Sequence, residues 1–158
     1  MTSLQSAVRR RRAVAAAAAV SAGLLLLTAC DKPTPMATIT VGDDSVHSEA
    51  TCYNDGKALS TADLAKCLKN TDVESIKVDP DDTVRFGVDP KLADEGWTIL
   101  MNDQPLTDSS KKSYRTIPGS VFFNAQYGAT GNSTKVAIKE GEKDVKGLWT
   151  FKLEKKSS

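Results

Sequence analysis

Thr83-Val84-Arg85-Phe86-Gly87-Val88 is the stretch that decides the fold, because inward-facing and outward-facing residue types alternate along it without a break. Alternation of this kind is typical of a β-strand with one buried face, so Val84, Phe86 and Val88 are predicted to point inward. An Asp-Pro-Asp-Asp turn precedes the stretch at residues 79–82, and Asp89-Pro90 follows it. We therefore expect a fold of short strands joined by tight turns.

Comparable short patterns recur along the rest of the chain. Strands are expected at residues 37–41, 46–53, 74–78, 83–88, 97–101, 113–117, 120–123, 134–139 and 148–153. One short helix is expected at Thr61–Lys69, after a capping-box-like pattern that begins at Ser60. These elements predict a mostly β fold, an antiparallel immunoglobulin-like β-sandwich with one short helix. A small open β-barrel is the alternative.

The N-terminal region has the layout of an export signal. Four arginines at residues 9–12 precede an apolar run from Ala13 to Leu27, which is short and rich in alanine for a membrane span. The run ends in Leu27-Thr28-Ala29-Cys30, which resembles the lipobox of bacterial lipoproteins. The resemblance implies cleavage between Ala29 and Cys30 and a diacylglyceryl group on the Cys30 sulfur. Export by the general secretory route and by the twin-arginine route both remain open.

This N-terminus divides the chain into three predicted parts: a lipoprotein signal peptide at residues 1–29, the lipidated cysteine with a short tether at residues 30–36, and a single β-sandwich domain at residues 37–155. Removal of residues 1–29 leaves 17 Lys and Arg against 20 Asp and Glu, a formal charge of −3. A slightly acidic domain argues against a nucleic-acid partner. Two acyl chains would hold the domain stably at the membrane.

Two cysteines remain once Cys30 is assigned to the lipid. Cys52 and Cys67 are 15 positions apart, far from the C-x-x-C spacing of redox and zinc motifs, and no histidine lies between them. An even pair outside the cytoplasm is typical of a structural disulfide. We predict a Cys52–Cys67 bond that joins the helix to the second strand.

Three segments together carry a wider resemblance: Leu-Thr-Ala-Cys-Asp-Lys-Pro at 27–33, Ala-Thr-Ile-Thr-Val-Gly at 37–42 and Glu-Ala-Thr-Cys-Tyr at 49–53. With them the chain is similar to a family of small actinomycete lipoproteins of unknown function. The resemblance implies attachment to the outer face of the cytoplasmic membrane in a Gram-positive cell envelope. It supplies no catalytic residues.

No catalytic constellation is visible in the sequence. The chain has one histidine, His47, on a predicted strand, and it has no nucleophile-elbow, S-x-x-K or P-loop pattern. A copper site would have only His47, Met36 and Met101 as ligands, and the Asp79, Asp81 and Asp82 turn lacks the spacing of a calcium loop. We predict no enzyme activity, no cofactor and no metal.

The function predicted from the sequence is a lipid-anchored, extracytoplasmic binding or interaction module whose ligand is unknown. A protein or a cell-wall component is the expected partner. The Gly- and Asn-containing stretch at residues 124–133, with Tyr127 exposed, is the candidate recognition loop. The alternatives are a cell-wall-associated hydrolase, with a cleft around His47 or an Asp pair, and a metal-handling lipoprotein.

Overall fold

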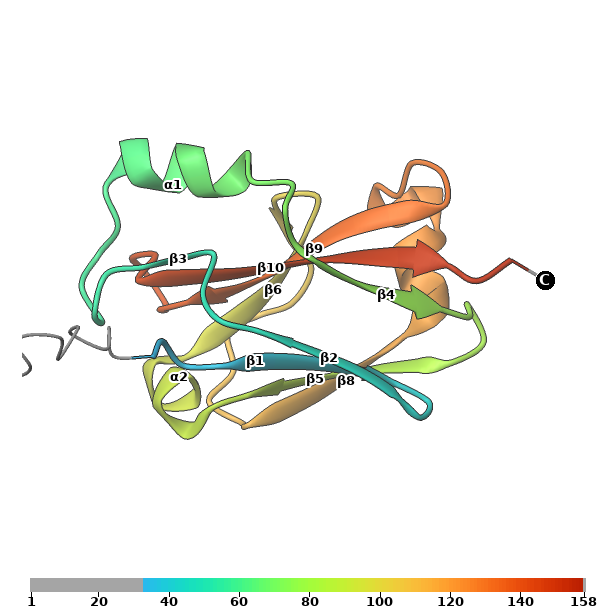
Figure 1. The fold of residues 1–158 in the computed structure, drawn as a ribbon, viewed down its shortest axis with the longest axis horizontal. Coiled ribbons are helices and arrows are strands. Elements are labelled where there is room, and N and C mark those ends of the chain that lie inside the picture. The colour runs from blue at the N-terminus through green and yellow to red at the C-terminus, as the bar shows by residue number, and fades with distance from the viewer. Residues whose placement is uncertain (1–32, 158) are drawn as a thin grey trace, which may run out of the picture. The chain divides into compact units, whose positions relative to one another are not determined.

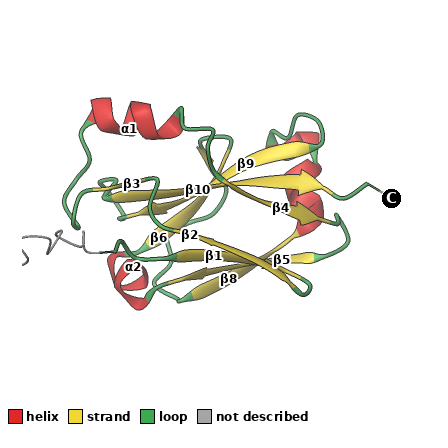
Figure 2. Cartoon of the chain, in the orientation of Figure 1, coloured by secondary structure: helices red, strands yellow, loops and turns green. Residues whose placement is uncertain are grey.

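The computed structural model describes residues 33–157 and confirms the predicted mostly β fold. Two sheets face one another as a sandwich and do not close into a barrel in this part of the chain (Figure 1). Strands make up both layers, and the helical segments lie at their margins (Figure 2). The predicted signal peptide, Cys30 and the Ala29–Cys30 cleavage site lie outside the described residues.

The first sheet has four antiparallel strands and contains the stretch from which the fold was predicted. Its order is β2 (Asp44–Ser48), β1 (Ala37–Val41), β5 (Thr83–Val88) and β8 (Tyr114–Pro118). Ile39 of β1 lies opposite Phe86 of β5, and both are fully buried. The alternation in β5 therefore reflects one buried face, as predicted, because its apolar side chains face the second sheet.

The second sheet is built around the longest strand, β10 (Gly147–Lys155). Along one edge β10 pairs with β9 (Ser133–Glu140), which is followed by β6 (Trp97–Met101) and β7 (Gln104–Pro105). Along its other edge β10 pairs first with β3 (Cys52–Tyr53), antiparallel, and then with β4 (Glu74–Val78), parallel. Two short strands thus share one edge of β10.

The core lies between the two sheets and is closed by aromatic and branched side chains. Trp97 and Trp149 are fully buried, and the Trp149 indole N–H donates to the carbonyl oxygen of Pro35 at 2.7 Å. The fully buried side chains of largest volume in this core also include Phe86, Phe122, Phe151, Ile39, Leu92, Ile99, Ile138 and Leu153. Burial of this apolar surface is the main favourable contribution to folding.

Helix α1 (Thr61–Leu68) confirms the predicted short helix and its cap. The Ser60 side chain accepts a hydrogen bond from the Asp63 backbone N–H at 3.1 Å. The helix packs its buried residue, Cys67, on the outer face of the second sheet, beside Leu148. Cys67 lies at disulfide distance from Cys52, with their Cα atoms 5.9 Å apart.

Three local expectations were wrong. The predicted second strand, 46–53, is two strands in different sheets, because the chain crosses from β2 to β3 at residues 49–51. Residues 120–123, predicted to be a strand, lie in a 3-10 helix, Gly119–Phe123. Gly119 turns the chain against the Asp79–Asp82 loop, and its N–H donates to the Asp82 carbonyl at 2.7 Å. One helix was expected, yet a second one, α2 (Pro90–Glu95), follows Asp89.

The segment assigned to the tether is partly bound to the domain. Thr34 accepts a hydrogen bond from the Ala50 N–H through its hydroxyl at 2.9 Å, and Pro35 is buried beneath Trp149. The Met36 N–H donates to the Asp89 carboxylate at 2.8 Å. Among residues 33–157, the helices are too short or too polar to span a membrane.

Candidate functional site

The edge of β10 has a gap in its strand pairing. Leu148 is the last β10 residue opposite β3, where it faces Cys52, and Phe151 is the first opposite β4, where it faces Glu74. Between them the Thr150 N–H donates to the Thr51 side-chain hydroxyl at 3.0 Å. A side chain thus replaces the neighbouring strand at this point and satisfies a backbone donor that would otherwise be left unpaired.

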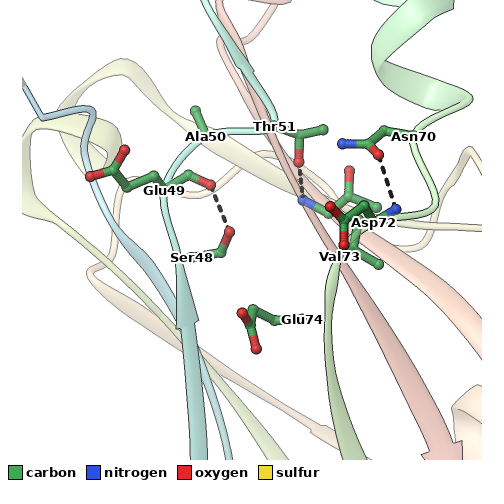
Figure 3. A pocket seen from close by; sticks show the side chains of 9 residues that line it. Ser48, Glu49, Ala50, Thr51, Asn70, Asp72, Val73 and Glu74 are labelled. Atoms are coloured by element: carbon green, nitrogen blue, oxygen red, sulfur yellow. Dashed lines mark hydrogen bonds between the residues drawn. The ribbon is translucent and has the colours of Figure 1, made fainter. Parts of the chain in front are cut away.

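A surface pocket of about 380 Å³ lies at this gap. We call it the β10-edge pocket. Two chain segments form its walls: residues 48–51, from the end of β2 to the start of β3, and residues 70–74, from the end of α1 to the start of β4. Strand β10 contributes one residue (Figure 3). Its lining residues are Ser48, Glu49, Ala50, Thr51, Asn70, Asp72, Val73, Glu74 and Thr150.

Local hydrogen bonds hold both walls in place. In the 48–51 segment the Ser48 hydroxyl donates to the Glu49 carbonyl at 2.8 Å, and the Ala50 N–H is held by Thr34. In the 70–74 segment the Asp72 N–H donates to the Asn70 side-chain oxygen at 3.0 Å, a turn typical of asparagine (Figure 3). These bonds fix the backbone of the walls and leave the side chains of Glu49 and Asp72 free to meet a ligand.

The pocket carries an unbalanced negative charge. Glu49, Asp72 and Glu74 are solvent-exposed and contribute three carboxylates, while no lysine, arginine or histidine of residues 33–157 lines the pocket. The remaining polar lining consists of hydroxyl groups and the Asn70 amide. Carboxylates and hydroxyls together accept hydrogen bonds from a cationic donor, so the chemistry of the pocket suits a positively charged, hydrogen-bonding group.

Thr150 adds a buried polar atom at the same place. The residue is 2% exposed, and its hydroxyl oxygen has no hydrogen-bond partner among the described residues. A buried hydroxyl without a partner is unusual and costs free energy. One of the pocket-lining residues therefore holds a hydrogen-bonding group that the described residues leave unused.

The residues considered for a catalytic or metal site do not assemble. His47 is exposed on the edge strand β2, opposite Thr38, and it precedes the pocket without lining it. Met101 is buried in β6 of the other sheet, and Met36 is bound at the start of β1 through its backbone. Over residues 33–157, no three His, Cys, Asp or Glu side chains are grouped so as to hold a metal ion.

The predicted recognition loop has its exposed aromatic residue. Tyr127 is 54% exposed at the end of a short 3-10 helix, Ala125–Tyr127, that Asn124 caps. The loop is tied to β6 and β7 through the Asn102 amide, which donates to the Gly128 carbonyl at 2.9 Å. It contributes no residue to the β10-edge pocket. The sequence did not single out Tyr114 on β8, which is 67% exposed.

The pocket residues themselves were not predicted. Asn70 and Asp72 lie in a polar stretch that has no motif, and their role depends on the distant pairing of β4 with β10. The sequence does show that a short polar stretch joins the α1 helix to the β4 strand. A connection this short keeps its polar side chains near one edge of the sheet, and this was the one feature from which the pocket could have been predicted.

Comparison with known proteins adds no family assignment. The chain matches no protein-family model and no curated protein.

Proposed function

We propose that the chain is a lipid-anchored, extracytoplasmic β-sandwich module that binds an organic ammonium group in the β10-edge pocket. One observation carries the proposal: three carboxylates line a pocket to which the described part of the chain contributes no basic side chain. Coulomb attraction to a cation near a protein surface amounts to about 4 kcal/mol at 4 Å before solvation and entropy costs. The net gain per exposed pair is much smaller, about 0.2–1 kcal/mol.

A metal ion suits the pocket less well than an organic cation. The carboxylates of Glu49, Asp72 and Glu74 are not grouped closely enough to act as ligands of one ion. Spread over a volume of about 380 Å³, they match a ligand of several atoms, with its ammonium near the carboxylates and hydroxyls beside Ser48 and Thr51. A lysine side chain of a protein and an amino sugar of a wall component share this chemistry.

The location rests on the lipobox resemblance of residues 27–30. If Cys30 carries diacylglycerol, three residues separate it from Thr34, which the Ala50 N–H binds to the domain. Extended chain covers about 3.5 Å per residue, so Thr34 would lie within about 14 Å of the lipidated cysteine. Because Thr34 holds the 48–51 wall, the pocket would then open close to the outer face of the membrane.

Chemical-shift perturbation by NMR on the full-length chain in detergent micelles tests ligand binding. Nα-acetyl-lysine amide and glucosamine are the two ammonium probes, and glucose and calcium are the comparison probes, all at low ionic strength because salt screens exposed charges. We expect millimolar affinity for the ammonium probes, with shifts at residues 48–51 and 70–74. The preferred probe distinguishes a protein ligand from a sugar ligand.

The charge variant Asp72→Asn/Glu74→Gln should weaken binding of the preferred probe at least fivefold. Asp43→Asn/Glu142→Gln removes the same two charges from exposed positions outside the pocket and is the matched control. Equal weakening by both double variants would show that the overall charge, and not the pocket, attracts the probe, and would refute the proposed site.

The anchor is tested separately with Cys30→Ser. The wild-type chain, expressed in a Gram-positive host, should fractionate with membranes and carry the mass of a diacylglyceryl cysteine at its new N-terminus. The variant should lack this mass. A membrane-bound wild-type protein without the lipid mass would contradict the anchor and leave the binding measurement unaffected.

A further inference from the structure

Glu140 is a carboxyl group that the fold buries without a partner. It ends β9, has no exposed surface, and neither of its carboxyl oxygens has a hydrogen-bond partner among the described residues. Strand pairing places Trp97 opposite it on one side and Gly147 on the other. Because paired residues share a face of the sheet, the Glu140 side chain points into the sandwich. An ionised carboxylate there would be costly unless a cation reached it.

Charged and titratable groups approach Glu140 from three surrounding elements. Helix α2 contributes Lys91 and Glu95, the β9–β10 connection (residues 141–146) contributes Lys146, and β3 contributes Tyr53, whose hydroxyl is also buried and faces Lys91. Asp144 lies near Lys146 and Asp55 near Lys91. Burial raises the pKa of Glu140, the negative charge of Glu95 raises it further, and Lys146 and Lys91 oppose the rise.

Lys146 is the cation best placed to respond to Glu140. Its ammonium is 2.5 Å from a carboxyl oxygen of Glu95, and its backbone N–H donates to the Glu140 carbonyl oxygen at 3.0 Å. The backbone bond keeps the start of the Lys146 side chain beside Glu140 whichever carboxyl the ammonium meets. Lys91 is engaged elsewhere, with its ammonium 5.3 Å from the centre of the Tyr53 ring.

We propose that Glu140 and Glu95 compete for Lys146, and that the proton on Glu140 decides the outcome. While Glu140 is neutral, Lys146 pairs with Glu95 and clasps α2 to the β9–β10 connection. When Glu140 loses its proton, the Lys146 ammonium turns inward to the new carboxylate and releases Glu95. The protein thus contains a pH-sensitive clasp at one end of the sandwich, closed while Glu140 is protonated and Glu95 is ionised, and open above the titration of Glu140.

The connection that carries Lys146 is linked to two other parts of the protein. The Gly141 N–H donates to the Gly96 carbonyl at the end of α2, at 2.7 Å. The backbone of Lys146 and Val145 accepts hydrogen bonds from Asn54 and Leu59, at 3.2 and 2.7 Å, in the loop before α1. Movement of Lys146 is therefore expected to change the protection of the Gly141 amide and of the 54–59 loop.

An NMR titration of the full-length, isotope-labelled chain in micelles tests the clasp. The readouts are the side-chain carboxyl carbons of Glu140 and Glu95, the side-chain nitrogen of Lys146 and hydrogen exchange at Gly141. We expect Lys146 and Gly141 to show an inflection at the midpoint of Glu140, and Glu140→Gln to abolish it. Persistence of the inflection in Glu140→Gln, or a Glu140 titration that leaves Lys146 unchanged, would overturn the proposal.

A second variant keeps the test valid if Glu140→Gln does not fold. Glu95→Gln removes the competing carboxylate, so the midpoint of the Glu140 titration should fall. The nitrogen signal of Lys146 should then change only with the titration of Glu140. Asp94→Asn removes one charge from an exposed neighbour on the same helix and serves as the control. If Asp94→Asn lowers the Glu140 midpoint as far as Glu95→Gln does, the effect is general charge and the competition for Lys146 is refuted.

Discussion

Gly147 lies directly opposite Glu140 in the β9–β10 pair, and the space that a Gly147 side chain would need is occupied by other side chains. A Cβ atom placed on Gly147 would come 2.6 Å from Cη2 of Trp149 and 3.0 Å from Oε2 of Glu140. The absence of a side chain at this position lets the indole and the buried carboxyl share one end of the core.

Gly147→Ala should therefore destabilise the protein by overpacking, by about 1–3 kcal/mol in the free energy of unfolding. Urea denaturation followed by tryptophan fluorescence measures it. Gly87→Ala in β5 is the control, since a Cβ there would be 4.0 Å from its nearest neighbours on Thr38 and the backbone is ordinary. Similar losses for the two variants would contradict the close packing at Gly147.

Glu140→Gln should change how stability depends on pH. Because the folded-state pKa of Glu140 lies above its ordinary value of 4.5, the folded wild type holds a proton that the unfolded chain releases. This contribution to stability is complete below about pH 4.5 and is lost as the pH rises through the raised pKa.

The amide in Glu140→Gln cannot titrate, so the unfolding free energy of the variant should not show the decrease with rising pH that Glu140 causes in the wild type. Unfolding free energies of both proteins, measured by urea denaturation at several pH values from 4 to 8, give the comparison. A difference between the proteins that does not vary over this range would show that Glu140 titrates alike in the folded and unfolded states.

Loss of the Cys52–Cys67 pair should destabilise the protein. Closing a loop of 15 residues contributes about 3 kcal/mol when the bond constrains the unfolded chain. The Cys52→Ala/Cys67→Ala variant should lose about that amount, with the earliest hydrogen exchange in α1. A reducing agent should destabilise the wild type and leave the double variant unchanged; a wild type indifferent to reduction would mean that the thiols are free.

Ser60→Ala should weaken α1 because it removes the cap on the Asp63 N–H. The expected cost is about 1 kcal/mol. Thr61→Ala, one residue further on in the first turn, has no side-chain hydrogen bond of this kind and should change stability little. Thermal unfolding of the two variants distinguishes a specific cap from a general effect of alanine at the helix start.

Much of the sheet structure could be predicted because alternation reports which residues are buried. It could not report which sheet a residue joins. The stretch 46–53 alternates throughout, yet it leaves the first sheet at Ser48 and enters the second at Cys52. Residues 119–123 show a second reason why the sequence pattern misleads. Close contact of Gly119 with the Asp79 and Asp82 carbonyls favours a helical turn over a strand.

The candidate site could not be predicted from local sequence patterns. Glu49, Asp72 and Glu74 look like solvated surface carboxylates in the sequence, and they share a pocket because β3 and β4 meet β10 at neighbouring positions. Glu140 looks like a polar strand end. Its burial depends on pairing with Gly147 and on coverage by Trp149, which the residues around it do not reveal.

The amino-acid sequence by itself determined the short alternating strands, the capped helix and the resemblance to a lipoprotein signal, because strand pattern, helix cap and lipobox each depend on residues a few positions apart. Only the tertiary structure decided three features: the gap in strand pairing along β10, the proximity of the three pocket carboxylates to one another, and the burial of Glu140. These arise from pairings between residues up to about a hundred positions apart, such as Thr51 with Thr150, whose contacts no local pattern encodes.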